Sequence, residues 1–214
     1  MQLSISSAKS VLCLGAHSDD IEIGCGGTLL AMLEQNPNLR IDWVVFSAAG
    51  DRGSEAKASF RAWCKSALNC KLHLFEFTDT LFPTQLAELK QTLSDLSKTV
   101  APDIVLTHRL EDAHQDHRTI AEITWNAFRN HWILEYEIPK YEGDLGRPNV
   151  YVPLSKETAE RKLALLMGEF ESQQSKPWYA RHTFQSIMQL RSIECRSESG
   201  YAEAFYGRKQ ILAV

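Results

Sequence analysis

Short apolar runs that alternate with longer amphipathic segments are the feature of this sequence that most restricts its fold. Residues 10–16 (SVLCLGA) are apolar almost throughout, as expected of a strand that is covered on both faces. The same reasoning predicts further strands at 40–47, 71–77 and 103–108. Amphipathic patterns between them predict helices at 22–35, at 54–68 with Ser54 as N-cap, and at about 83–98. This alternation predicts a parallel sheet with helices on both faces, joined by right-handed crossovers.

The second half of the chain continues the alternation. We expect helices at about 116–130, 155–171 and 178–192, and strands at 133–139, 149–154 and 204–214. No repeat, low-complexity tract or linker separates these segments, and 214 residues with 44% hydrophobic content suffice for one sizeable core. We therefore expect one domain over residues 1–214. Its fold class is α/β, a Rossmann-like three-layer sandwich with a mostly parallel sheet.

Composition excludes several kinds of protein. A net charge of −4 argues against nucleic-acid binding, which needs a basic surface. No apolar run approaches the roughly 18–20 residues of a membrane span, and the N-terminal MQLSISSAKS does not resemble a signal peptide. The five cysteines are odd in number and form no CxxC motif, which favours reduced thiols. We therefore expect a cytoplasmic protein without a membrane span.

Polar residues gather after two of the predicted strands. His17, Asp19 and Asp20 follow the first strand, and residues 108–117 (HRLEDAHQDH) follow the fourth. In an open parallel sheet, ligands bind beyond the carboxyl ends of the strands, so these two segments are expected to face one crevice. Histidine and carboxylate side chains together suit Zn²⁺ or Fe²⁺. The same donors would also suit a redox iron site, and the sequence leaves that alternative open.

Helix capping is the simpler explanation for some of these acids. Asp20 and Asp116 each precede a predicted helix and could serve as its N-cap. Capping accounts for one acid per helix, however, and not for two adjacent acids beside a histidine. The nearby Gly-Cys-Gly-Gly at 24–27 lacks the spacing of a phosphate-binding loop, so we interpret it as allowing close helix packing.

Two motifs together resemble a known family. AHSDD followed by IEIGCGGTL, with EDAHQDH about 90 residues later, is similar to the LmbE-like/PIG-L deacetylases. The resemblance extends over roughly residues 9–174, and SGYAEAF at 199–205 resembles the family's C-terminal segment. It implies a hydrolase that removes N-acetyl groups from N-acetylglucosamine-type sugars and conjugates, with a divalent metal that is usually zinc.

The resemblance also implies roles for individual residues. His17 and Asp20, with His117, would be the three metal ligands. Asp19 would be the general base for the metal-activated water, and His114 would protonate the leaving amine or stabilise the oxyanion. Asp116 would orient a histidine from behind the site. Such a three-ligand site keeps a coordination position open for water and substrate.

Substrate contacts follow less directly from the resemblance. The family's sugar-contacting arginine falls near Lys57 by spacing, with Arg52 and Arg61 as alternatives. Asp79 occupies the position expected to hold a sugar hydroxyl, and Glu203 is a further candidate for lining the pocket.

Other functions stay open at this point. Some relatives are metal-dependent hydratases of small unsaturated dicarboxylic acids, and basic residues would suit an acidic substrate: Arg52, Lys57, Arg109 and Arg118. A catalytically silent metal-binding protein is a third possibility. The sugar's aglycone, the native metal and the oligomeric state, including a homo-oligomer, are not determined by the sequence.

Overall fold

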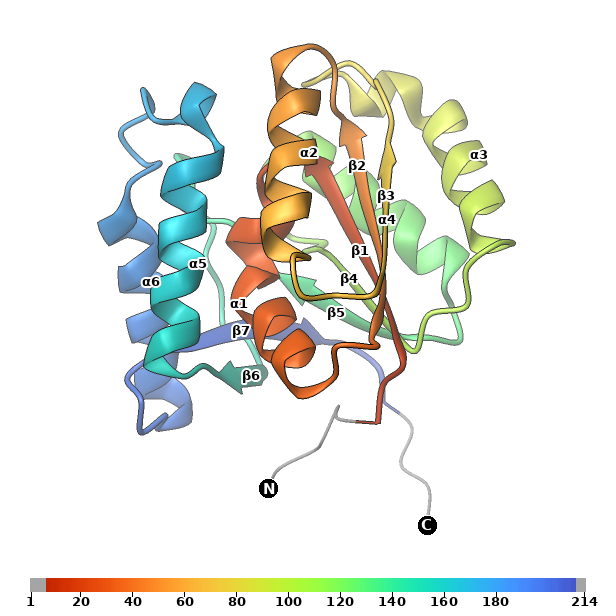
Figure 1. The fold of residues 1–214 in the computed structure, drawn as a ribbon. Helices are drawn as coiled ribbons and strands as arrows, with labels where there is room; N and C mark the ends of the chain where they lie inside the picture. The colour runs from red at the N-terminus through yellow and green to blue at the C-terminus, as the bar shows by residue number, and fades with distance from the viewer. Residues whose placement is uncertain (1–6, 211–214) are drawn as a thin grey trace.

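A seven-stranded sheet forms the centre of the protein (Figure 1). The structure, a computed structural model, describes residues 7–210. Strand order across the sheet is β3-β2-β1-β4-β5-β7-β6. The strands are β1 (Ser10–His17), β2 (Arg40–Ser47), β3 (Asn69–Leu74), β4 (Ile104–His108), β5 (Trp132–Tyr136), β6 (Val150–Pro153) and β7 (Ala202–Gly207). The first five strands are parallel, which confirms the predicted α/β class with a mostly parallel sheet.

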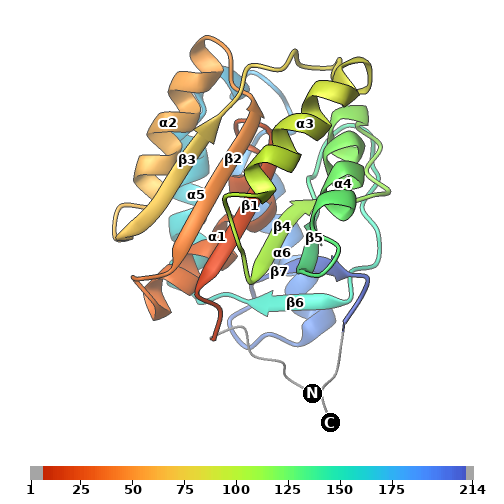
Figure 2. The ribbon, with the colours of Figure 1, turned by 90° about the vertical axis from the view of Figure 1, so that its right-hand side faces the viewer.

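Helices cover both faces of this sheet, so the fold has three layers. They are α1 (Asp20–Gln35), α2 (Asp51–Trp63), α3 (Leu86–Ser97), α4 (Gln115–Ala127), α5 (Lys156–Glu169) and α6 (Arg181–Cys195), with short 3₁₀ turns at Phe82–Gln85 and Glu171–Gln173. One apolar core lies between the sheet and α1, α2, α5 and α6, and a second lies beneath α3 and α4 (Figures 1 and 2). No helix within residues 7–210 is both long and apolar enough to cross a membrane.

The far edge of the sheet departs from a simple parallel pattern. The last strand, β7, is antiparallel to β5 and inserts between β5 and β6. The predicted late strand at 204–214 is therefore present but spans Ala202–Gly207, and residues 211–214 of that prediction lie outside the described residues. The five cysteines are free thiols, as predicted.

Helix starts differ from the capping predictions. The second helix begins at Asp51, with Gly50 as N-cap at a φ of 59°, a left-handed conformation that glycine adopts at little cost. Ser54 is therefore inside the helix, and its predicted capping role is wrong. Neither Asp20 nor Asp116 is an N-cap: Asp19 occupies that position before α1, without a side-chain capping bond, and His114 occupies it before α4. The Asp20 carboxylate accepts a hydrogen bond from the His17 N–H instead.

Glycines in the first turns of α1 bring this helix close to its neighbours. A Cβ on Gly24 would lie 2.2 Å from the ring of Tyr136 on β5, and one on Gly26 would lie 2.9 Å from the Trp63 indole nitrogen. The glycine-rich segment thus serves close packing, as the sequence indicated, and it sets the position of Asp20 at the start of the same helix.

A buried ion pair ties α1 to the C-terminal part of the chain. Lys162 on α5 lies 2.6 Å from Glu203 on β7, and both side chains are almost fully buried. Glu203 accepts hydrogen bonds from the backbone N–H groups of Gly27 and Thr28, while Lys162 donates to the Ile23 carbonyl. The charges are therefore satisfied against the backbone of α1, as burial of an ion pair requires.

The close approach of α1 to β5 can be tested with Gly24→Ala. We expect this variant to lose about 1–3 kcal/mol of unfolding free energy, since its methyl group must displace the Tyr136 ring. Gly168→Ala, in α5 with open space around the position, is the matched control and should be neutral or slightly stabilising. Urea denaturation of both variants measures the difference, and equal stabilities would contradict the packing argument.

Candidate metal centre

The two polar motifs meet because their strands are neighbours. Strands β1 and β4 pair in parallel, with Val11 opposite Ile104, and they end at His17 and His108. The chain leaves β1 toward β2 and β3 on one side of the sheet, and β4 begins the other side. Side chains that are about 100 positions apart in the sequence therefore converge at this switch point, as the sequence predicted.

Three side chains with metal-binding atoms lie within contact distance of one another at this point. The Nε2 atom of His117 is 3.2 Å from Nδ1 of His17. The Asp20 carboxylate completes the set, with Oδ2 3.3 Å from His17 Nδ1 and Oδ1 3.4 Å from His117 Nε2. Ligands at about 2.0–2.1 Å from a tetrahedral zinc ion are separated by roughly 3.3 Å, so these spacings fit such an ion.

Two other groups of side chains overlap with this one. They are His17 with His114 and Asp116, and His108 with Asp112 and His117. The carboxylates of both groups are committed elsewhere: Asp116 accepts from the N–H groups of Thr80 and Phe82, and Asp112 pairs with Lys140. The set of His17, Asp20 and His117 is therefore the best candidate for holding a divalent ion.

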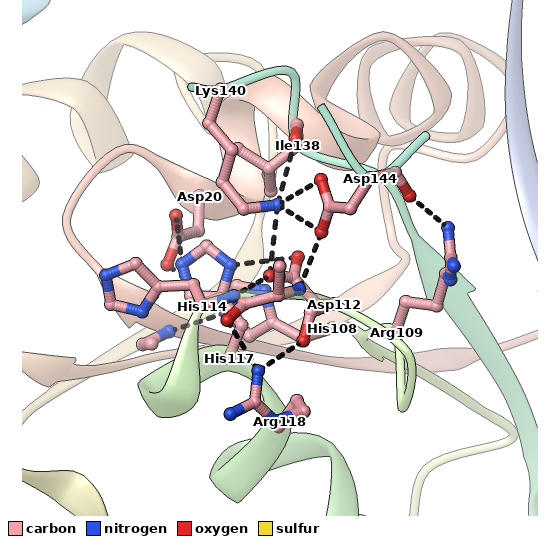
Figure 3. Close-up of polar contacts among 12 residues, drawn as sticks. Asp20, His108, Arg109, Asp112, His114, His117, Arg118, Ile138, Lys140 and Asp144 are labelled. Carbon is pink, nitrogen blue, oxygen red and sulfur yellow. Dashed lines mark hydrogen bonds and ion pairs between the residues drawn. The ribbon is translucent and has the colours of Figure 1, made fainter. Parts of the chain in front are cut away.

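A carboxylate and a lysine support His117 from behind (Figure 3). Asp112 Oδ2 lies 3.1 Å from His117 Nδ1, and Asp112 Oδ1 lies 3.0 Å from the Lys140 ammonium. Burial alone would raise the pKa of Asp112, but the hydrogen bond and charge of His117 and the charge of Lys140 hold it well below its usual value. Asp112 is therefore an ionised acceptor for the Nδ1 proton, which leaves Nε2 free for a metal.

His108 packs against the face of the His117 imidazole. Its ring stacks on that of His117 with centroids 4.0 Å apart. Burial, together with the charge of His117, lowers the pKa of His108 to about 4, so this histidine is neutral near pH 7. Its Nε2 atom accepts a hydrogen bond from the Ala16 N–H, a contact that joins the ends of β4 and β1.

The outer side of His17 faces two further carboxylates. Its Nε2 atom lies 2.9 Å from Asp79 and 3.3 Å from Asp116. Asp116 also accepts the N–H of Thr80, a residue with a φ of 68° that β-branched side chains rarely adopt. Asp116 therefore holds the turn that presents Asp79, in addition to contacting a histidine as the family resemblance implied.

Protonation differs among the three histidines of the crevice. Burial would lower the pKa of His17 and His117, but Asp20 and the neighbouring carboxylates raise both above the usual value. Burial and the charges of His117 and His17 lower the pKa of His114. The His114 Nδ1 accepts the Asp116 N–H, so Nε2 is the atom that can carry a proton toward a ligand.

A cleft of about 330 Å³ opens over these residues. Asp19 lines it and lies 2.5 Å from the Arg52 guanidinium, which also contacts Glu55 and Ser172. The cleft is lined on its other side by the loop after β5 and by the segment before α6: Ile138, Lys140, Tyr141, Glu142, Gln173, Lys176 and Trp178. The site residues predicted in the two motifs, except the fully buried Asp116, line this cleft together with Arg52 and Asp79.

Three of the predicted substrate contacts are not brought to the cleft: Lys57, Arg61 and Glu203. Lys57 lies on the exposed side of α2 and is not among the cleft residues. Glu203 is buried against Lys162 and the backbone of α1, so its prediction as a pocket residue is contradicted by its position. Arg109 and Arg118 also lie outside the cleft and bond to backbone carbonyls.

The two motifs do not predict every residue at this site. Asp112 lies inside the motif EDAHQDH, five residues before His117, but it is buried and supports His117 without lining the cleft. Lys140, Tyr141 and Trp178 belong to segments without a motif. Only the fold shows that these segments border the cleft.

Known proteins resemble this chain in sequence and in fold. The Escherichia coli (strain K12) protein named "Uncharacterized deacetylase YaiS" is 29% identical over 174 residues, covering 76% of this chain and 91% of the relative. An N,N'-diacetylchitobiose deacetylase from Pyrococcus horikoshii superposes with a TM-score of 0.70 at 20% identity, over 93% of this chain and 83% of that one. GalB, the 4-carboxy-2-hydroxymuconate hydratase from Pseudomonas putida KT2440, superposes with a TM-score of 0.76 at 18% identity, over 96% and 98%.

At these identities the superpositions establish the shared fold. The family assignment comes from the sequence itself. The family model PIG-L, described as GlcNAc-PI de-N-acetylase, matches residues 12–128, which is more than half of the chain and includes both polar motifs. This chain therefore belongs to the PIG-L family of deacetylases.

Proposed function

We propose that this protein is a metal-dependent hydrolase that removes the N-acetyl group from an N-acetylglucosamine-type sugar conjugate. The observation that carries the proposal is the approach of three side chains, His17, Asp20 and His117, whose imidazole nitrogens lie 3.2 Å from each other and 3.3–3.4 Å from one or the other Asp20 oxygen. Two histidines and one aspartate leave a fourth position open, as in catalytic zinc sites. Zinc is the proposed ion, although Fe²⁺ or another divalent metal suits the same donors.

The reaction adds water across an amide bond and releases acetate and a free amine. A divalent ion in such a site polarises the amide carbonyl and makes water more acidic. Asp19 is the proposed general base, since its carboxylate lines the cleft beside Asp20 without belonging to the donor set. The ion pair with Arg52 holds this carboxylate in place at the edge of the cleft.

The leaving nitrogen needs a proton donor. His114 lines the cleft and is the proposed donor. As an imidazolium it would give a proton to the amine, whereas the neutral ring, whose Nδ1 accepts a backbone N–H, can donate a hydrogen bond from Nε2 to the carbonyl oxygen as negative charge develops there. The proposed role of Asp116 is to orient His17, which it contacts directly. It also accepts the Thr80 N–H in the turn that presents Asp79.

Support for a sugar substrate comes from the cleft and from the similar proteins. Asp79 has an exposed carboxylate beside His17, and Arg52 is the one predicted basic contact that the cleft contains. Half-buried Trp178 and exposed Tyr141 add apolar ring surface at the other end. The Pyrococcus protein named above acts on an N-acetylated disaccharide, and the family model is described by an N-acetylglucosamine-containing substrate.

The hydratase alternative has less support. It depended on basic residues near the pocket, and three of those four side chains lie outside the cleft: Lys57, Arg109 and Arg118. The remaining one, Arg52, is already paired with Asp19. Likeness to GalB shows a common fold and leaves the reaction to be decided by assay.

Metal binding is the first test. The purified protein should bind about one zinc ion per chain, and His117→Ala should lose it, because three ligands are the usual protein contribution to a catalytic site. His182→Ala, an exposed histidine on α6, is the matched control and should retain zinc. Isothermal titration of the metal-free proteins measures both. Unchanged zinc affinity in His117→Ala would contradict the assigned ligand set.

Metal affinity should also depend on pH in a defined direction. The raised pKa values of His17 and His117 mean that a metal must displace protons from them, so affinity should fall as pH decreases, beginning above about 6.5. The metal-free protein should behave oppositely. In that protein the raised pKa values of His17 and His117 contribute stability that is fully present below about pH 6.5. This contribution is lost as the pH rises through those pKa values. Chelator competition and thermal unfolding across this range measure the two trends, and parallel trends would contradict the assignment.

Asp19→Asn tests the proposed base. We expect zinc binding to persist while acetate release from an N-acetylglucosamine conjugate falls by about 10²–10⁴-fold. Asp51→Asn, which removes an exposed carboxylate at the start of α2, should leave the rate unchanged. Undiminished acetate release in Asp19→Asn would remove the proposed role. Water addition to an unsaturated dicarboxylic acid, without acetate release from any N-acetyl sugar, would favour the hydratase instead.

A further inference from the structure

Lys140 is a buried lysine on the loop between β5 and β6, and it lies at the edge of the cleft. Its ammonium contacts Asp112 at 3.0 Å, both carboxylate oxygens of Asp144 at 2.8 Å and the Ile138 carbonyl at 3.4 Å. An ammonium has three donors, and these three partners occupy them. Lys140 therefore does not present a free charge to a substrate, in contrast to the exposed Lys176 across the same cleft.

Asp112 connects this lysine to the candidate metal ligand (Figure 3). One of its oxygens contacts Lys140 and accepts the His114 N–H at 2.8 Å, and the other lies 3.1 Å from Nδ1 of His117. Asp112 and Lys140 are both almost fully buried, with side chains 3% and 6% exposed. A charge-assisted contact between two buried groups restricts the orientation of the carboxylate more than a neutral hydrogen bond does.

Lys140 also belongs to a broader attachment of its loop to the metal-ligand segment. The Asp144 carboxylate accepts the Ala113 N–H at 2.6 Å, and the Asp144 carbonyl accepts from Arg109 at 2.7 Å. The loop is thus held against residues 109–113 at several points, and Lys140 is the side chain of the loop that reaches Asp112. This places the ammonium in a supporting position behind His117.

We propose that Lys140 is a positioning residue for the metal centre. Through Asp112 it fixes the His117 imidazole with Nε2 directed at His17 and Asp20, and it thereby increases affinity for a divalent ion. The inference rests on the metal site proposed above and adds a residue to it that neither sequence motif contains. Partners behind a metal-bound histidine commonly change metal affinity by about 10–100-fold.

The test compares two lysines that line the same cleft. In Lys140→Met we expect the zinc dissociation constant to rise by about 10–100-fold. Lys176→Met removes a lysine without contact to the metal-ligand segment and should leave zinc affinity unchanged. Chelator competition gives the affinities, and circular dichroism of the metal-free variants confirms that each is folded. Wild-type affinity in folded Lys140→Met would overturn the proposal.

A double-mutant cycle separates positioning from general destabilisation. If Lys140 acts through Asp112, the double variant Lys140→Met with Asp112→Asn should bind zinc no more weakly than Asp112→Asn alone. Additive losses would overturn the proposed route. Lys140→Arg keeps the charge and should restore most of the affinity, which also provides a test if Lys140→Met does not fold. Absence of zinc binding by the wild-type protein would instead contradict the metal site itself.

Discussion

The parallel pairing of β1 with β4 is the constraint on which the candidate site depends. Each strand ends in a histidine, and the chain continues from them to opposite sides of the sheet, so their carboxyl ends open onto one crevice. The end of β1 brings His17, the start of α1 brings Asp20, and the start of α4 brings His117. The hydrogen bond from the Ala16 N–H to His108 joins the two strand ends directly beneath these side chains.

Burial makes the charges at this crevice dependent on one another. Asp20 and Asp112 are nearly inaccessible to water, and each stays charged because histidine or lysine side chains surround it. Removing one partner would leave a buried charge without compensation, which is far more costly than losing an exposed ion pair. This dependence links the two motifs to the loop after β5, because Lys140 of that loop is the partner of Asp112.

Local periodicity predicts the succession of strands β1 to β5 along the chain and the helices between them. The two motifs could also be predicted, because each consists of residues adjacent in sequence. The buried position of Glu203 could not be predicted, because its partner Lys162 is 41 positions away and only the folded chain brings the two side chains together. Lys140 was missed for the same reason. The antiparallel direction of β7 and its place between β5 and β6 could not be predicted either, because the sequence of a short apolar strand does not indicate the direction in which it pairs.

The ion pair between Lys162 and Glu203 has a consequence for the helix that presents Asp20. Glu203 is on β7, and among the described residues β6 pairs with the sheet through that strand. Loss of the Glu203 carboxylate would leave Lys162 as a buried charge whose ammonium is bonded to the Ile23 carbonyl in the first turn of α1. The start of this helix, and with it Asp20, therefore depends on a charge balance supplied by α5 and β7, away from the two motifs.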